Sequence, residues 1–230
     1  MVELELSLNA LTGSIPSSIE YATQLKILFL DRNYLSGELP RSIGNLQSLT
    51  NLRLSTNYIS GSIPDVFQNM VNLTEIDLGN NELTGSIPRS FGYLTLLETM
   101  DLAQNRLIAC VPNTMDRLLE LAAFEIQFNM LSCVESGLSN LFDHLKNYGC
   151  YMYGNPWNCP LGTTIPKACE ATCSICNNAN TKGNCQACVT ADQRCGYCDV
   201  GMNCILGNAS GPIQGYYCQS GNWFYGKGSC

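Results

Sequence analysis

A strict period of 24 residues constrains this chain more than any other feature. Asparagine recurs with that step at Asn9, Asn33, Asn57, Asn81, Asn105 and Asn129. Three more ladders share the period: Pro16, Pro40, Pro64, Pro88 and Pro112; Leu6, Leu30, Leu54, Leu78, Leu102 and Ile126; and Gly13, Gly37, Gly61 and Gly85. One turn of this length cannot bury its own leucine and isoleucine side chains, whereas stacked turns share a core. The period therefore predicts a solenoid in which each turn contacts its neighbours.

Each turn is expected to have the same local structure. The L-x-L segment favours a short strand, and strands of neighbouring turns would pair about 4.8 Å apart in a parallel sheet. The asparagine after that strand can bond backbone groups that the bend leaves unpaired. The glycine suits a bend that has no room for a side chain. Proline fits the extended I-P segment, and a short helical turn is expected after it, for example over residues 41–46.

The repeating unit reads L-x-x-L-x-L-x-x-N-x-L-T-G-x-I-P. It resembles the leucine-rich-repeat family, in particular the 24-residue class with the L-T-G-x-I-P segment best known from plants, and the resemblance covers residues 1 to about 155. The family implies an α/β solenoid, a right-handed superhelix with a parallel sheet on its concave face. It also implies recognition and assembly through protein contacts.

The repeat fades in its sixth turn, where Glu135 and Ser136 replace the Ile-Pro pair. Apolar residues then follow a helical spacing over residues 138–147, and residues 148–160 are expected to form a seventh strand that leads into a cysteine-bearing cap. The predicted domains are a repeat solenoid over residues 1–147, a cap over 148–173 and a small disulfide-rich module over 174–230.

All 14 cysteines lie between residues 110 and 230. Cys110 and Cys133 fall one position apart on adjacent turns, so their backbones should be close enough for a disulfide. Two buried free thiols are the alternative interpretation of this pair. The other twelve cysteines gather in the cap and the module, where a small core would need covalent support.

The module carries Cys185-Gln-Ala-Cys188 followed by Cys195-Gly-Tyr-Cys198. This pattern resembles the plexin–semaphorin–integrin module, although Tyr197 stands where that family usually has tryptophan. The resemblance implies four bridges: Cys176–Cys195, Cys185–Cys230, Cys188–Cys204 and Cys198–Cys218. It would leave two bridges for the cap, made from Cys150, Cys159, Cys169 and Cys173.

The C-x-x-C spacings also suit zinc ligands, and zinc remains the alternative to disulfides. The even cysteine count and the single histidine favour disulfides, with no metal or cofactor. Disulfides indicate an oxidising compartment, so a secreted or cell-surface protein is expected. The triplets Asn72-Leu-Thr74 and Asn208-Ala-Ser210 are acceptor sequences for N-linked glycans.

The formal net charge of −7 argues against nucleic-acid binding, which needs clustered Lys and Arg. No stretch approaches about 18 consecutive apolar residues, so no membrane span is predicted. His144 is the single histidine, and it is expected at the surface of the cap helix. Neither a catalytic triad nor a phosphate loop can be assembled, so the chain is not expected to be an enzyme.

The concave face should be formed by the x positions around L-x-L. One row reads Glu5, Phe29, Arg53, Asp77, Asp101, Glu125 and Gly149, and its neighbour reads Glu3, Ile27, Asn51, Glu75, Thr99, Ala123 and Asn147. The face is acidic, which suits a basic or mixed partner or calcium, although a merely solvated surface is equally compatible. The candidate ligand-binding residues are Ile27, Phe29, Asp31, Arg53, Glu75, Asp77, Asp101 and Glu125.

The leading functional hypothesis is a non-catalytic glycoprotein that mediates recognition or adhesion through the repeat surface. A second hypothesis is a structural subunit of an extracellular filament or matrix, assembled head-to-tail from copies of the chain. It arises because the sequence starts at a repeat boundary without a preceding cap and ends on the last module cysteine, Cys230. That start and end would also fit a piece of a longer polypeptide. A third hypothesis is an inhibitor of a secreted hydrolase.

Overall fold

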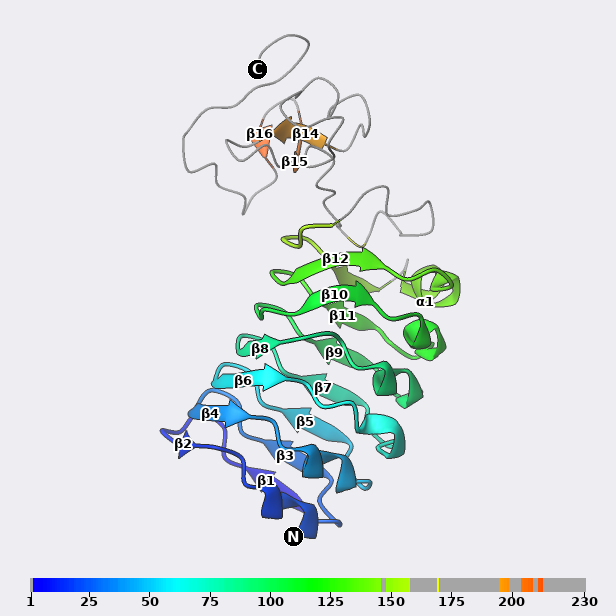
Figure 1. Ribbon diagram of the computed structural model, residues 1–230. Helices are drawn as coiled ribbons and strands as arrows, with labels where there is room; N and C mark the ends of the chain where they lie inside the picture. The colour runs from blue at the N-terminus through cyan, green and yellow to red at the C-terminus, as the bar shows by residue number, and fades with distance from the viewer. Residues whose placement is uncertain are drawn as a thin grey trace. The chain divides into compact units, whose positions relative to one another are not determined.

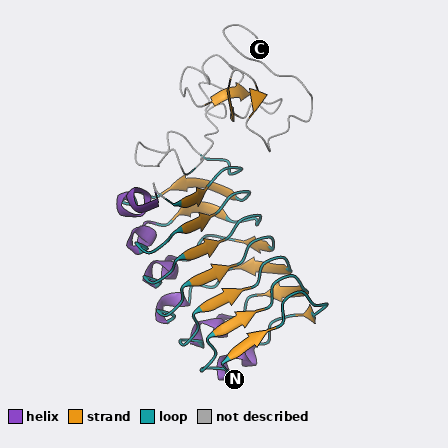
Figure 2. Cartoon of the chain, turned by 180° about the vertical axis from the view of Figure 1, so that it is seen from behind, coloured by secondary structure: helices purple, strands orange, loops and turns teal. Residues whose placement is uncertain are grey.

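The computed structural model describes residues 2–145, 148–157 and 169, together with the backbone of three further strands over 195–198, 204–208 and 211–212. The chain forms two compact units. The first unit is a stack of similar turns, each with a strand on one side and a short helix on another (Figures 1 and 2). This arrangement confirms the α/β solenoid that the period predicts.

A parallel sheet of seven strands runs the length of the solenoid. Its strands follow chain order, one from each turn, because every turn brings the same L-x-L segment back beside its predecessor. They are β1 (Glu3–Glu5), β3 (Ile27–Phe29), β5 (Asn51–Arg53), β7 (Glu75–Asp77), β9 (Thr99–Asp101), β11 (Ala123–Glu125) and β13 (Gly149–Tyr151). From β3 to β11 the middle residue is buried and its two neighbours are half-buried, so alternate side chains form the core and the concave face.

Further strands follow the bend in most turns, and the sequence analysis did not predict them. β2 (Thr12–Gly13), β4 (Tyr34–Glu38), β6 (Tyr58–Ser62) and β8 (Glu82–Thr84) form a four-stranded sheet, and β10 (Ile108–Val111) pairs with β12 (Met130–Val134). The ladder glycines lie in these strands or, for Gly85, directly after one, and their φ is positive, for example +77° at Gly37; a residue with a Cβ adopts such a φ only under strain.

Short helices close the turns at the edge opposite the bends that join the two sets of strands (Figure 1). Five are 3₁₀ helices: η1 (Ser17–Tyr21), η2 (Arg41–Asn45), η3 (Phe67–Asn69), η4 (Arg89–Tyr93) and η5 (Asn113–Arg117). Four of them begin directly after a ladder proline whose φ lies between −75° and −62°. The sixth turn instead has the α-helix α1 (Ser139–Leu145), where the apolar spacing predicted a helix.

The asparagine ladder binds consecutive turns together. In the third turn, Asn57 Oδ1 accepts a hydrogen bond of 2.9 Å from Leu35 N, while its Nδ2 donates to Leu30 O and Leu54 O at 3.0 Å each. Asn57 is 7% exposed. The predicted role of this residue is therefore confirmed, and one amide satisfies backbone groups of two turns at once.

The last turn differs from the prediction. Gly149 pairs with Ala123, and Tyr151, not Gly149, continues the row of Glu125. The predicted position of Gly149 is wrong because the sixth turn is longer: its asparagine step runs from Asn129 to Asn155, 26 residues, and accommodates α1. Asn147, which was expected beside Ala123, lies outside the described residues.

The second unit is described through three antiparallel strands, β14 (Cys195–Cys198), β15 (Cys204–Asn208) and β16 (Gly211–Pro212). Cys198 lies opposite Cys204 in this pairing. Asn208, the second predicted glycan site, is the last residue of β15. The four bridges expected in the module, and the zinc alternative, concern side chains outside the described residues. In the described part of the chain, no helix is both long and apolar enough to cross a membrane.

Candidate functional site

The concave face, defined as the solvent side of the seven-stranded sheet, holds all eight predicted ligand-binding residues. Ile27 and Phe29 are the outer residues of β3, and Asp31 follows two positions later. The other five occupy outer positions of β5, β7, β9 and β11: Arg53, Glu75, Asp77, Asp101 and Glu125. Each of the eight is half-buried, so the sheet presents them side by side to solvent.

Arg53 is held by its neighbours. Its Nε donates to Glu75 Oε1 at 2.5 Å and its Nη2 to Glu75 Oε2 at 3.1 Å, while its Cζ lies 4.3 Å from the centre of the Phe29 ring. Asn51 Nδ2 also donates to Glu75, at 2.7 Å. The hydrogen bond with Glu75 raises the pKa of Arg53. This group is therefore a neutralised ion pair stacked on an aromatic ring, and its charge is already compensated.

Three carboxylates on adjacent strands form what we call the carboxylate row: Asp77, Asp101 and Glu125, the last residues of β7, β9 and β11. Strand pairing places Asp101 directly between the other two. Within the described residues, none of the three forms an ion pair with Lys or Arg. The row is thus a line of carboxylates that no ion pair neutralises, because Arg53, the strand neighbour of Asp77, forms its ion pair with Glu75.

Local hydrogen bonds orient these carboxylates. Asp77 Oδ2 accepts from Ser55 Oγ at 2.5 Å and Asp101 Oδ1 from Ala103 N at 2.8 Å. Gly79 leaves the space that Asp101 occupies, because a Cβ there would lie 2.9 Å from both carboxylate oxygens. The Glu125 carboxylate accepts from a glutamine side chain two residues later, at 3.0 Å.

Burial makes the ionised forms of Asp77 and Asp101 costly. Desolvation raises the pKa of Asp101 to about 6; the Ala103 N–H lowers it and the charges of Asp77 and Glu125 raise it further. Desolvation also raises the pKa of Asp77. A cation placed over the row would offset this cost, and its attraction would increase as Asp101 ionises.

An aromatic group adjoins the row and was missed by the sequence analysis. Tyr151 continues the row beyond Glu125 and is 40% exposed. The Tyr151 and Tyr153 ring centroids are 6.4 Å apart, and those of Phe128 and Tyr153 are 5.1 Å apart. The 26-residue step to Asn155 was the signal that could have placed Tyr151 here. Asp31 lies nearer the first turn and accepts a hydrogen bond from the Ser7 hydroxyl.

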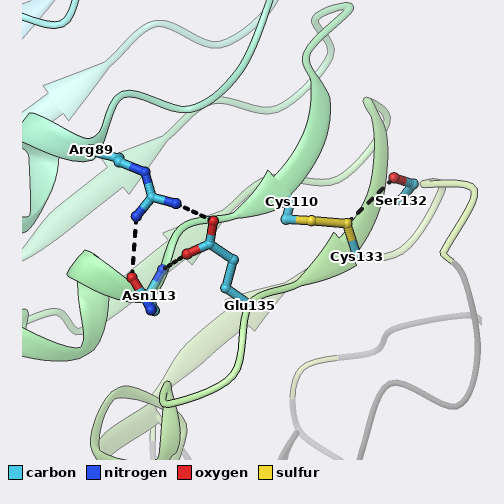
Figure 3. The surroundings of a disulfide bond; sticks show 6 residues. All are labelled: Arg89, Cys110, Asn113, Ser132, Cys133 and Glu135. Carbon is cyan, nitrogen blue, oxygen red and sulfur yellow. Dashed lines mark hydrogen bonds and ion pairs between the residues drawn. A yellow bond between two sulfur atoms is a disulfide. The ribbon is translucent and has the colours of Figure 1, made fainter.

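Two disulfides are present among the described residues. Cys110 in β10 and Cys133 in β12 are joined, with Cα atoms 4.4 Å apart, as the sequence analysis predicted (Figure 3). On the same edge Arg89 donates to Glu135 and to Asn113. The second bond joins two of the four cysteines expected in the cap, Cys150 and Cys169.

The remaining predicted residues do not join this surface. Asn72 is exposed, although its Nδ2 donates to Gln47 O at 2.9 Å. His144 was expected at the surface, but it is partly buried and its ring stacks on Tyr148 with 4.8 Å between the ring centroids, while α1 packs against η5 of the preceding turn. No three His, Cys, Asp or Glu side chains converge on a common point among the described residues, so calcium finds no cage of protein carboxylates there.

Comparison with known proteins identifies the repeats. Family models described as leucine-rich repeat match residues 24–46 and 47–107. A plant peptide hormone receptor, RGFR1 in complex with RGF2, is 30% identical with a TM-score of 0.65. The match covers 75% of this chain and 27% of the receptor chain. The ectodomain of GASSHO1/SCHENGEN3 from Arabidopsis thaliana, in complex with CASPARIAN STRIP INTEGRITY FACTOR 2, is 31% identical with a TM-score of 0.63. The match covers 69% of this chain and 19% of the GASSHO1/SCHENGEN3 chain.

A chain of the BIR3–SERK2 complex from Arabidopsis thaliana is 32% identical with a TM-score of 0.51, over 59% of this chain and 70% of its own. No curated protein matches the sequence. The first two neighbours are plant receptors, and the two disulfides of this chain fit an oxidising environment such as the extracellular space. The chain belongs to the leucine-rich-repeat family. It spans 27% and 19% of the first two receptors, which are much longer.

Proposed function

We propose that this protein is a non-catalytic recognition protein, secreted or at the cell surface, whose concave face binds a basic segment of a protein or peptide partner. The carboxylate row carries the proposal. Asp77, Asp101 and Glu125 form a line of charge across three adjacent strands, without a cationic partner among the described residues.

The energetics favour a cationic ligand. A carboxylate whose pKa is raised by burial gains more from a nearby cation than a fully solvated one does, because the cation offsets desolvation as well as neighbouring repulsion. Tyr151 and the Phe29 ring under Arg53 flank the row and offer aromatic contact area, the kind of anchor that dominates protein interfaces. Lys and Arg side chains of an extended segment would therefore face the row, with apolar side chains toward the two aromatic ends.

The structural neighbours support this class of function. They include plant receptors in complex with peptide hormones or co-receptors: RGFR1 with RGF2, and HAESA with the peptide hormone IDA and the co-receptor SERK1. This chain is 30% and 27% identical to those two receptors. A peptide partner for the present chain is an extension of that similarity.

The rest of the chain has a supporting role in this proposal. Residues 1–147 would bind the partner, residues 148–173 would cap the solenoid, and residues 174–230 would act as a plexin–semaphorin–integrin-like spacer that orients neighbouring domains. Exposed Asn72 is the better supported glycan site of the two. Adhesion, head-to-tail filaments and hydrolase inhibition remain predictions without a residue-level observation in their favour.

Selection of random 12-residue peptides on the secreted protein tests the proposal. Peptides enriched in Lys and Arg are expected on the wild type, and they should lose binding at least tenfold to the triple variant Asp77→Asn, Asp101→Asn and Glu125→Gln. Glu120→Gln is the matched control, since this exposed carboxylate lies outside the strands. Selected peptides without basic enrichment, or equal binding to the triple variant, would contradict the proposal.

A further inference from the structure

A second surface with its own chemistry lies where the chain bends from the seven-stranded sheet into the four-stranded sheet. It is a shallow pocket with a volume of about 380 Å³, at the small end of the range of roughly 300–1,000 Å³ that ligand sites occupy. Its walls come from four successive turns: Asn9, Arg32, Asn33, Tyr34, Thr56, Asn57, Tyr58 and Asn80.

Two tyrosines form an aromatic platform in this pocket. Tyr34 begins β4 and Tyr58 begins β6, and each is 54% exposed. Their ring centroids lie 6.3 Å apart with 17° between the ring planes. Equivalent positions in other turns carry Ala10, Glu82 and Arg106, so the repeat itself does not require an aromatic side chain here. The pair therefore offers an apolar ring surface that the solenoid core does not use.

Arg32 supplies the single charge in the wall. Its φ of +55° projects it from the bend, and it is exposed. Its guanidinium forms no ion pair or side-chain hydrogen bond with the residues that the structure describes. No carboxylate lines the pocket. In a chain with a net charge of −7, a free guanidinium without an acidic neighbour in its pocket selects for an anion.

The polar groups divide into structural and available ones. Asn33 and Asn57 are 5% and 7% exposed, and their amides are committed to backbone groups of the ladder. Thr56 and Asn80 are exposed, with a long 3.3 Å contact from Asn80 Nδ2 to Thr56 Oγ1. Asn9 is exposed too, but its Nδ2 already donates to Leu6 O and Ser7 O. Exposed amides and a hydroxyl can donate and accept in several directions, which matches a ligand rich in hydroxyl groups.

We propose that this pocket binds an acidic oligosaccharide. The apolar C–H face of a pyranose ring would stack on Tyr34 and Tyr58, and a uronic carboxylate would take a bidentate hydrogen bond from Arg32. Thr56 and Asn80 would bond the ring hydroxyls. An acidic peptide could also reach Arg32, but hydroxyl-directed amides beside two nearly parallel rings favour the sugar. The site is separate from the carboxylate row, so its test does not depend on the proposed function.

Calorimetric titration of the whole chain with a uronic-acid tetrasaccharide tests this inference, with a neutral gluco-oligosaccharide of equal length and tetra-glutamate as comparison ligands. Saturable binding of the acidic sugar is expected, at least tenfold tighter than binding of either comparison ligand. Arg32→Gln should weaken it at least tenfold and weaken its salt dependence. Arg106→Gln is the matched control and should leave it unchanged, because Arg106 pairs with Glu82 at 3.3 Å outside the pocket wall.

The double variant Tyr34→Ala and Tyr58→Ala should abolish binding while the far-ultraviolet circular dichroism stays that of the wild type, since both rings are half exposed. Absence of saturable binding by the wild-type protein would overturn the inference. Equal affinity of wild type and Arg32→Gln, or equal binding of tetra-glutamate, would overturn it as well.

Discussion

Asn105→Ala should destabilise the solenoid strongly, because this amide satisfies buried backbone groups in two turns. Its Oδ1 accepts from Leu83 N at 2.9 Å, and its Nδ2 donates to Leu78 O at 3.0 Å and Leu102 O at 3.2 Å. Asn105 is only 8% exposed, so water does not replace these partners without opening the stack. Alanine would leave the Leu83 N–H without its acceptor, whereas Leu78 O and Leu102 O would each keep a second donor, from Asn81 and Asn129.

A buried donor left without an acceptor costs about 1–3 kcal/mol, so we expect a loss of about 1–3 kcal/mol of unfolding free energy. Urea denaturation followed by far-ultraviolet circular dichroism measures it as a lower midpoint at unchanged slope. Asn9→Ala is the matched control in the same ladder. Its two hydrogen bonds, to Leu6 O and Ser7 O, are exposed, and we expect less than about 1 kcal/mol.

Equal destabilisation by the two substitutions would refute this reasoning. It would mean that the cost comes from an intrinsic preference for asparagine at the bend and not from burial of the groups it satisfies. A loss of less than about 1 kcal/mol of unfolding free energy for Asn105→Ala would also refute it.

Three other substitutions test separate parts of the structure. Asp101→Asn should stabilise the fold above pH 6 by on the order of 1–2 kcal/mol, after allowance for solvent screening, and should have little effect near pH 4. The raised pKa of about 6 means that folding favours the protonated carboxyl of Asp101. The free energy of unfolding of the wild type therefore falls as the pH rises from about 4 to 6. Thermal denaturation across that range measures it. Gly92→Ala should lower the free energy of unfolding by about 1–3 kcal/mol, since the new Cβ would lie 2.3 Å from a carbonyl oxygen of the next turn. Gly13→Ala is the control: its Cβ would meet open space, so only the strain of a positive φ remains, about 1 kcal/mol. Replacing Cys110 and Cys133 by serine should cost about 3 kcal/mol, measured by urea titration, because the bond closes a loop of 23 residues.

Much of the fold could be predicted from the sequence because a repeat multiplies one local rule. The parallel sheet, the asparagine hydrogen bonds and the helices after the prolines all follow from a single turn. The second set of strands could not, because the segment after the bend has no alternating apolar pattern; Tyr34, Ser36 and Glu38 expose their side chains, and pairing there depends on the stack. The Tyr151 register failed for a related reason, since a two-residue insertion is invisible to a fixed 24-residue step.

The concave face was predicted as a set of residues, whereas its electrostatics needed coordinates. Sequence placed Arg53 and Glu75 in neighbouring rows as separate candidates, but the structure joins them in one ion pair under which Phe29 stacks. Asp101 looked equivalent to Asp77 and Glu125 in the sequence. Its distinct pKa arises from desolvation by the surrounding side chains and from its central position, neither of which a repeat position encodes.

The pH dependence of partner binding tests the central claim most directly. The affinity of a basic peptide selected on the wild type should be measured between pH 4.5 and 7.5 for the wild type and for Asp101→Asn. Ionisation of Asp101 near pH 6 predicts that wild-type affinity rises through this range and levels off above it, with a much smaller change in the variant. Parallel profiles for the two proteins would contradict the claim that the carboxylate row recognises the partner.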